Sequence, residues 1–158
     1  MSVIKIGDKV PDFTFECTDP SIRSFKDLLG KNVVLYFYPK DNTPGCTIEG
    51  REFKLFHDFF LKENTIIIGV SRDTIASHHK FCEKLGLPFP LIADPSKKLC
   101  EMFDVIIRDN WLLSKLLVTH RSTFLIDANG TIKHGWYNVR AKGHAQVVLN
   151  FIKTMTIT

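Results

Sequence analysis

Two continuous apolar runs mark the centre of the chain. Residues 33–38 read Val-Val-Leu-Tyr-Phe-Tyr and end at Pro39, and residues 65–71 read Thr-Ile-Ile-Ile-Gly-Val-Ser. A strand with one wet face alternates apolar and polar residues, whereas an unbroken apolar run of this length is typical of a strand buried on both faces. The two runs therefore predict central strands of a covered sheet.

The segment between these runs has a helical pattern. Phe53, Phe56 and Phe60 recur at the three- and four-residue spacing that places side chains on one face of a helix. Glu49 and Glu52 fall on its other faces, and the pattern ends near residue 62. We expect an amphipathic helix that packs its phenylalanines against the sheet.

A second helix is expected after the second strand. Asp73 or Thr74 can accept a hydrogen bond from the first turn of a helix that runs to Leu85. Gly86 can end this helix in the left-handed conformation. Strand and helix thus alternate along the first half of the chain.

The second half adds a shorter helix opened by Asp94, a β-hairpin around the Ala128-Asn-Gly turn, and a last helix. The short helix is expected over residues 95–103, the two strands of the hairpin over 122–127 and 131–136, and the last helix over 143–153. Alternating helices and strands with a hairpin near the end predict an α/β fold, in which helices cover both faces of a mixed sheet. No linker or repeat interrupts the pattern, so we expect a single domain over residues 1–158.

The composition fits one compact domain that needs no disulfide or metal to hold its core. The chain has 158 residues, of which 44% are apolar and 24% charged. The 21 Lys and Arg and 17 Asp and Glu are spread without a basic block, which argues against nucleic-acid binding. No apolar run is long enough to cross a membrane, and the first residues lack the pattern of a signal peptide. We therefore expect a cytoplasmic protein with free thiols.

The four cysteines are Cys17, Cys46, Cys82 and Cys100, and no two are closer than 18 residues. Without a CxxC pair, a zinc ribbon and a thioredoxin-type dithiol site both lose their main sequence support. A lone cysteine is usually a small buried apolar residue, and this interpretation is kept for Cys17 and Cys100.

The most informative segment is Pro-Lys-Asp-Asn-Thr-Pro-Gly-Cys, from Pro39 to Cys46. It places Cys46 where a buried strand has ended and a helix begins, so that free amides and the positive end of the helix dipole favour thiolate over thiol. Thr43 can turn its hydroxyl toward the same place, and the two prolines stiffen the loop. From this context alone, Cys46 can be either a reactive or a structural thiol.

Pro39, Thr43 and Cys46 reproduce the Pro-x-x-x-Thr-x-x-Cys motif of the peroxiredoxins. The longer string from Phe37 to Thr47 resembles the subgroup of bacterioferritin comigratory proteins, also called peroxiredoxin Q. The resemblance continues in residues 7–13, 69–71, 80–91 and 121–127. It implies a thioredoxin-like fold and a thiol peroxidase.

The resemblance also implies roles for individual residues. In peroxiredoxins a cysteine thiolate attacks a hydroperoxide and becomes a sulfenic acid, and the attacking residue here would be Cys46. Negative charge develops on the peroxide oxygens, so hydrogen-bond donors must point at them. Thr43, the loop amides near Gly45 and the guanidinium of Arg121 would be those donors, and Pro39 would shield the thiolate from water. The rigid fork of arginine has no equivalent in lysine.

Many members of the subgroup carry a second cysteine five residues after the first, where this chain has Arg51. Other members use a cysteine on the next helix, which makes Cys82 the candidate resolving thiol. Its spacing from Leu85 also fits a core position, and a one-cysteine peroxidase resolved by an external thiol stays open. A disulfide needs Cα atoms within about 7 Å. We therefore expect the helices at Cys46 and Cys82 to unwind on oxidation and to expose the disulfide to thioredoxin or a similar dithiol.

Two further features bear on ligands and partners. His78, His79 and Cys82 lie close on one helix, but no partner cluster completes a zinc site, so neither a metal nor a cofactor is expected. Residues 110–118 are strongly apolar where the family often has glycine and polar residues. This segment could be a short packed helix, a self-association patch or a site for bulky hydroperoxides, and we expect a monomer or a weak homodimer.

Two other functions fit the same fold. A redox sensor or a chaperone-like protein that binds a partner could use oxidation of Cys46 to change the exposure of the apolar segment without turning over. A thiol-disulfide oxidoreductase is a second alternative, although the missing CxxC pair argues against it.

Overall fold

The computed structural model describes residues 3–108 and 117–156. A six-stranded sheet in the order β1-β4-β3-β2-β7-β8 forms its centre, and β5 and β6 form a separate two-stranded sheet. The strands are β1 (Glu16–Cys17), β2 (Asn32–Phe37), β3 (Thr65–Ser71), β4 (Leu91–Ala93), β5 (Ile106–Arg108), β6 (Leu117–Thr119), β7 (Ser122–Ile126) and β8 (Ile132–Trp136). The mixed sheet predicted from the alternating pattern is confirmed.

The two apolar runs form the central strands β2 and β3, which are parallel and pair from Asn32↔Thr65 to Phe37↔Val70. β4 continues the parallel set beside β3, whereas β7 runs antiparallel to β2 and β8 antiparallel to β7. Residues 33–38 are all buried. The unbroken apolar run therefore reflects a strand covered on both faces.

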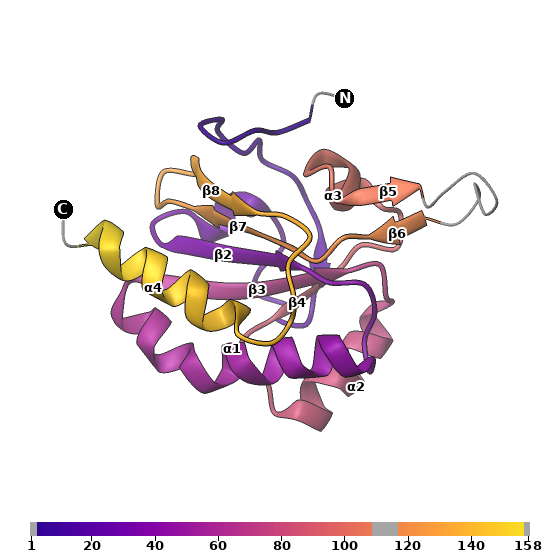
Figure 1. Ribbon diagram of the computed structural model, residues 1–158. Helices are drawn as coiled ribbons and strands as arrows, with labels where there is room; N and C mark the ends of the chain where they lie inside the picture. Colours follow the sequence, from indigo (N-terminus) through magenta and orange to yellow (C-terminus); the bar gives the residue numbers. More distant parts are fainter. Residues whose placement is uncertain (1–2, 109–116, 157–158) are drawn as a thin grey trace.

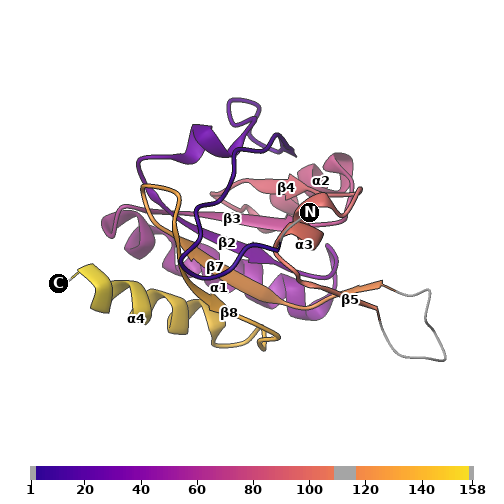
Figure 2. The same ribbon diagram turned by 90° about the horizontal axis from the view of Figure 1, so that it is seen from above.

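Helices cover both faces of the sheet unequally. They are η1 (Phe25–Leu28, a 3-10 helix), α1 (Pro44–Lys62), α2 (Ile75–Leu85), α3 (Lys98–Met102) and α4 (His144–Thr156). In Figure 1, α1, α2 and α4 lie below the sheet. Seen from above in Figure 2, the N-terminal segment and α3 cross the opposite face.

Each face of the sheet has its own apolar core. Under the three long helices, Phe53 and Phe60 of α1 pack with Tyr36 of β2 and Leu149 of α4. Phe56, expected on the same face as the other two phenylalanines, is partly buried against this core. The opposite core gathers side chains from η1, α3 and the N-terminal segment around Phe37. The loop and helix starts at the carboxyl ends of β2 and β3 lie beside the first core.

The helix expected over residues 95–103 is shorter in the structure, where α3 begins at Lys98. Lys97 adopts a positive φ of 67° directly before it, so regular helix cannot extend back to Pro95. Asp94 still acts at this helix start, because its carboxylate accepts the backbone N–H groups of Leu99 and Cys100 at 3.1 and 2.9 Å.

The apolar segment 110–118 falls mostly outside the described residues. Its last two residues, Leu117 and Val118, form part of β6 rather than a short helix. β6 pairs antiparallel with β5 through Arg108↔Leu117, and this hairpin extends from the side of the sheet (Figure 1).

Cys17 and Cys100 are buried, as expected, and all four cysteines are free thiols. None of the helices in residues 3–108 and 117–156 is long and apolar enough to span a membrane.

Candidate active site

Cys46 lies in the first turn of α1, directly beyond the carboxyl end of β2. Thr43 has extended backbone geometry at the N-cap, Pro44 occupies the first helical turn, and the Thr47 amide donates to the Thr43 carbonyl at 2.9 Å. Proline suits this place because its fixed φ fits a helix start and its missing N–H needs no partner there. Cys46 is 2% exposed. The thiol is therefore held at the positive end of a 19-residue helix and shielded from water.

Arg121 joins this helix start to the sheet. It directly precedes β7, and its Nη2 donates to Cys46 Sγ at 3.5 Å. Its Nη1 donates to Glu49 Oε1 at 2.7 Å, so one guanidinium spans two side chains one turn apart on α1. A Cβ at Gly45 would lie 2.9 Å from Nη2. The glycine before the cysteine thus leaves the space that the guanidinium occupies.

Glu49 is a site residue that the sequence pattern did not indicate. The pattern assigned it to a polar helix face, but the residue is fully buried, and its ion pair with Arg121 explains that position. Burial raises the pKa of Glu49 to about 7, and the positive charge of Arg121 opposes that rise. An acidic residue one turn after the cysteine was the available signal.

The Thr43 hydroxyl is oriented by its own loop. Its Oγ1 donates to the Lys40 carbonyl at 2.7 Å. Its hydrogen is therefore engaged, and the oxygen lone pairs remain to accept a hydrogen bond. This differs from the donor role expected from the sequence. Pro39, at the start of the loop, is half-buried.

Cys82 lies on α2 and is only partly buried. Its Sγ contacts Thr18 Oγ1 at 3.9 Å, a weak interaction, and the residue lines a surface pocket of about 530 Å³. Burial raises the pKa of the Cys82 thiol, partly offset by the Thr18 contact. Cys46 belongs to the apolar core under the three long helices, and Cys82 packs against the same core.

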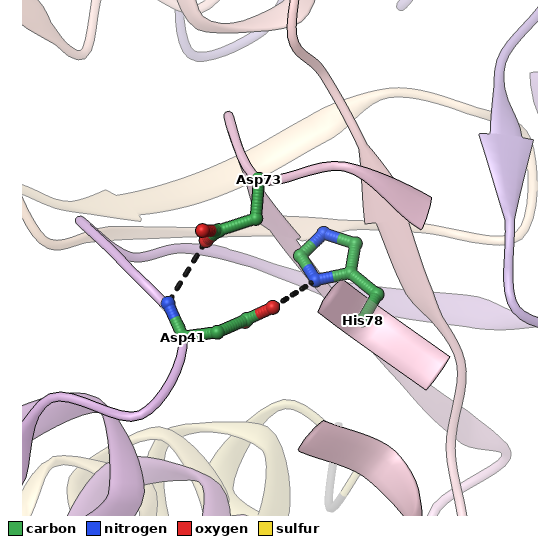
Figure 3. Close-up of side chains that lie close together, drawn as sticks. All are labelled: Asp41, Asp73 and His78. Atoms are coloured by element: carbon green, nitrogen blue, oxygen red, sulfur yellow. Dashed lines mark hydrogen bonds and ion pairs between the residues drawn. The ribbon is translucent and has the colours of Figure 1, made fainter. Parts of the chain in front are cut away.

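A buried polar cluster lies between the two cysteine helices. Figure 3 shows Asp41 from the β2–α1 loop, Asp73 from the β3–α2 loop and His78 from α2 converging on one another. One ligand atom from each residue lies within 4.8 Å of the others, a spacing that could hold a metal ion. However, each of the three side chains is already engaged in hydrogen bonds to protein groups. Of the proposed zinc trio on α2, His78 turns into this cluster, whereas His79 is exposed.

The AhpC/TSA family pattern matches residues 6–135. The chain belongs to the AhpC/TSA family. Peroxiredoxin Bcp of Bacillus subtilis is 42% identical over 158 residues, which cover 97% of this chain and 98% of the relative.

Solved structures of peroxiredoxins superpose closely on this fold. A cysteine-to-serine mutant of Xylella fastidiosa PrxQ gives a TM-score of 0.91 at 38% identity and covers 99% of both chains. Xanthomonas campestris bacterioferritin comigratory protein, in a structure described for its alkyl peroxide reduction, gives 0.84 at 37% identity over 90% of this chain and 91% of that chain. The resemblance inferred from the sequence is thus confirmed: this peroxiredoxin has the thioredoxin-like fold and is a thiol peroxidase that acts on hydroperoxides with a thiol reductant.

Proposed function

We propose that Cys46 is the peroxidatic nucleophile of this peroxiredoxin. Its thiolate attacks the near oxygen of a hydroperoxide, the O–O bond breaks, and the far oxygen leaves as water or an alcohol after it takes up a proton. Cys46 is left as a sulfenic acid. The observation that carries this assignment is the guanidinium of Arg121, which lies 3.5 Å from Cys46 Sγ in a buried position.

Arg121 and Thr43 have complementary parts in this step. The guanidinium stabilises both the thiolate and the negative charge that develops on the peroxide oxygens. Because the Thr43 hydroxyl already donates to Lys40, its oxygen can accept the hydrogen of the hydroperoxide and orient the substrate. Glu49 holds the guanidinium in position through their ion pair, and Pro39 shields the Cys46 thiolate from water. The backbone amide of Cys46 is a further donor at the helix start.

The substrates include hydrogen peroxide and organic hydroperoxides. The chemistry at Cys46 needs only the two oxygens, so the group attached to the far oxygen can vary. Alkyl peroxide reduction by the related Xanthomonas campestris protein supports the organic class.

We further propose that Cys82 resolves the sulfenic acid. Its sulfur attacks Cys46 Sγ, a disulfide forms, and the sulfenic oxygen leaves as water. A dithiol protein such as thioredoxin then reduces the disulfide and regenerates both thiols. Cys82 suits this second role because it is partly exposed beside a surface pocket and its Sγ contacts the uncharged Thr18 hydroxyl.

The disulfide requires local unfolding. Cys46 and Cys82 lie within two different helices, α1 and α2, and a disulfide needs Cα atoms within about 7 Å. We expect the first turns of α1 and the part of α2 around Cys82 to lose hydrogen-exchange protection on oxidation. Equal protection in both redox states would contradict this step.

The test is peptide mapping by mass spectrometry. Reduced protein is treated with one equivalent of hydrogen peroxide, the remaining thiols are alkylated, and the digest is analysed without reductant. The proposal predicts a Cys46–Cys82 linked peptide. Sulfenic or sulfinic acid at Cys46 with alkylated Cys82 would show a one-cysteine peroxidase, and unmodified Cys46 would overturn its assignment as nucleophile.

The cytoplasmic location, the choice of thioredoxin and the monomer or weak homodimer remain predictions. Sedimentation velocity at low micromolar concentration tests the last of these, because a homodimer through the apolar segment 110–118 would make the mass depend on concentration.

A further inference from the structure

The cluster around Asp41 joins the loop that precedes Cys46 to the helix that carries Cys82. We propose that Asp41 and His78 are positioning residues that hold the Cys46 loop and the Cys82 helix in their folded arrangement, and thereby set the rate of disulfide formation. This inference rests on the proposed Cys46–Cys82 disulfide. Neither residue touches the reacting atoms, so both act through the backbone segments that they join.

Three donors converge on the Asp41 carboxylate, which is buried. Tyr38 donates its hydroxyl to Oδ1 at 2.6 Å, and Ser77 donates to Oδ2 at 2.7 Å. His78 Nδ1 lies 2.8 Å from the same Oδ2. Burial by itself would raise the pKa of Asp41, but the hydrogen bonds from His78 and Tyr38 outweigh it and lower the pKa. The carboxylate therefore remains an acceptor for all three groups.

The His78 ring is held at both nitrogens. Its Nε2 lies 2.9 Å from the carbonyl of Ile92 in β4, which can only accept, so Nε2 carries a hydrogen. Its Nδ1 faces the Asp41 carboxylate, so the one ring links α2 to β4 and to the loop before Cys46. The ring is 0% exposed. Water therefore cannot replace either partner while the helix is folded.

A second link fastens the same loop. The backbone amide of Asp41 donates to Asp73 Oδ2 at 2.8 Å, and the Ser71 hydroxyl donates to the same oxygen. Asp73 belongs to the turn that leads into α2. The loop before Cys46 is thus bonded through its side chain to α2 and through its backbone to the residues that begin α2.

Asp41 and His78 each lie close in sequence to one of the two cysteines. Asp41 is five residues before Cys46, and His78 is one helical turn before Cys82. Movement of the loop at Asp41 or of the helix turn at His78 breaks bonds to this one carboxylate. Because the peroxide reacts with the folded form and the disulfide forms from the unfolded form, weakening the cluster affects the two steps differently.

Two substitutions at one position separate this role from general stability. In His78→Asn the side-chain amide reaches the place of Nδ1 and can keep the bond to Asp41. In His78→Gln it reaches the place of Nε2 and keeps only the bond to Ile92. Thr65→Val is the matched control, because it removes a buried hydroxyl that donates to the Glu63 carbonyl at 2.9 Å, at the opposite end of β3. Ser77→Ala is a milder second variant should His78→Gln fail to fold.

The readouts are rapid-quench rates of Cys46 sulfenic acid formation and of the Cys46–Cys82 linked peptide, both by mass spectrometry. Because His78→Gln loses the hydrogen bond to the Asp41 carboxylate, we expect this variant to form the disulfide about tenfold faster than the wild type. Ser77→Ala should do so by a smaller factor. Sulfenic acid formation should change less than twofold in both variants. The peroxide concentration that gives sulfinic acid at Cys46 should rise with the disulfide rate, because resolution competes with over-oxidation. His78→Asn and Thr65→Val should match the wild type.

Equal disulfide rates in His78→Gln, Ser77→Ala and wild type would overturn the positioning role while leaving the proposed function intact. An equal acceleration in Thr65→Val or in His78→Asn would also overturn it, since global stability would then set the rate. Absence of a linked peptide from the wild type would instead overturn the resolving role of Cys82, and this inference with it.

Discussion

Cys46 and Cys82 belong to the same side of the sheet and to neighbouring helices, yet they differ in burial and in the groups that they contact. Cys46 is 2% exposed at the start of α1 and faces a guanidinium that an ion pair holds in place. Cys82 is partly exposed within α2, lines a pocket, and contacts the Thr18 hydroxyl at 3.9 Å.

The difference shows how one fold supports two kinds of sulfur chemistry. Attack on a peroxide needs a fixed positive charge and exclusion of water, and both cost conformational freedom. Exchange with a partner dithiol needs access and movement. The rigid environment therefore surrounds Cys46, whereas Cys82 lies in a helix whose link to the Cys46 loop is a hydrogen-bonded cluster that can break.

The largest expected effect separates the two thiols directly. Cys46→Ser should lower the rate with hydrogen peroxide by several orders of magnitude, because the nucleophile is lost. Cys82→Ser should leave the first turnover within about twofold of wild type and abolish steady turnover with thioredoxin. Single-turnover and steady-state assays on both variants measure this. Loss of the first turnover in Cys82→Ser would remove the distinction between the two sites.

Arg121→Lys tests the fixed charge beside Cys46. Lysine keeps the charge but cannot span Cys46 and Glu49 with two separate donors, so we expect about a 100-fold loss in kcat/KM for peroxide. Arg51→Lys on the exposed face of α1 is the control and should retain full activity. Full activity of Arg121→Lys would mean that charge alone suffices.

Gly45→Ala probes the space that the guanidinium uses. The added Cβ would lie 2.9 Å from Arg121 Nη2 and must displace it, and we expect about a tenfold loss in kcat/KM. Gly50→Ala on the same helix brings a Cβ only to 3.4 Å from the flexible end of Leu85 and should keep its activity. Steady-state rates with hydrogen peroxide compare the two, and equal rates would show that the arginine can move.

Burial of His144, on the same side of the sheet as Cys46, should make the folding stability of the protein depend on pH. Burial, with a contribution from the charge of Arg121, lowers the pKa of His144 to about 4 from 6.5. The unfolded chain therefore binds the proton first as pH falls. The part of the unfolding free energy that depends on neutral His144 is fully present above pH 6.5. It decreases as the pH falls to about 4, by at most about 3 kcal/mol.

The check is urea unfolding of wild type and His144→Gln from pH 7.5 to 4. Glutamine can keep a bond near Thr123 Oγ1, which lies 2.7 Å from His144 Nε2. The stability advantage of the wild type should shrink as pH falls through this range. Taking the difference cancels the opposite trend of Glu49, whose raised pKa favours the folded state at low pH. If the difference in unfolding free energy between the two proteins stays constant with pH, the lowered pKa of His144 is contradicted.

Periodicity alone located the long elements of the fold. The apolar runs at β2 and β3 and the phenylalanine spacing of α1 are strong signals because a buried face repeats over many residues. The helix at Pro95 was placed too early because the Asp94 cap was visible in the sequence, but the left-handed Lys97 that interrupts the segment was not. The strand β6 lacked any signal, since its pairing with β5 joins residues across the apolar segment.

For the site, the residues from Pro39 to Cys46 already determined a stiff loop, a helix start and a thiol placed in its first turn, because these depend on neighbours in the chain. Resemblance to peroxiredoxins added the expectation that Arg121 approaches Cys46, which only the tertiary structure brings within 3.5 Å. The burial of Glu49 and the Asp41–His78 cluster gave no readable pattern. A charged residue becomes buried only when a partner distant in sequence meets it, and that meeting is decided when β7 and α2 pack against the start of α1.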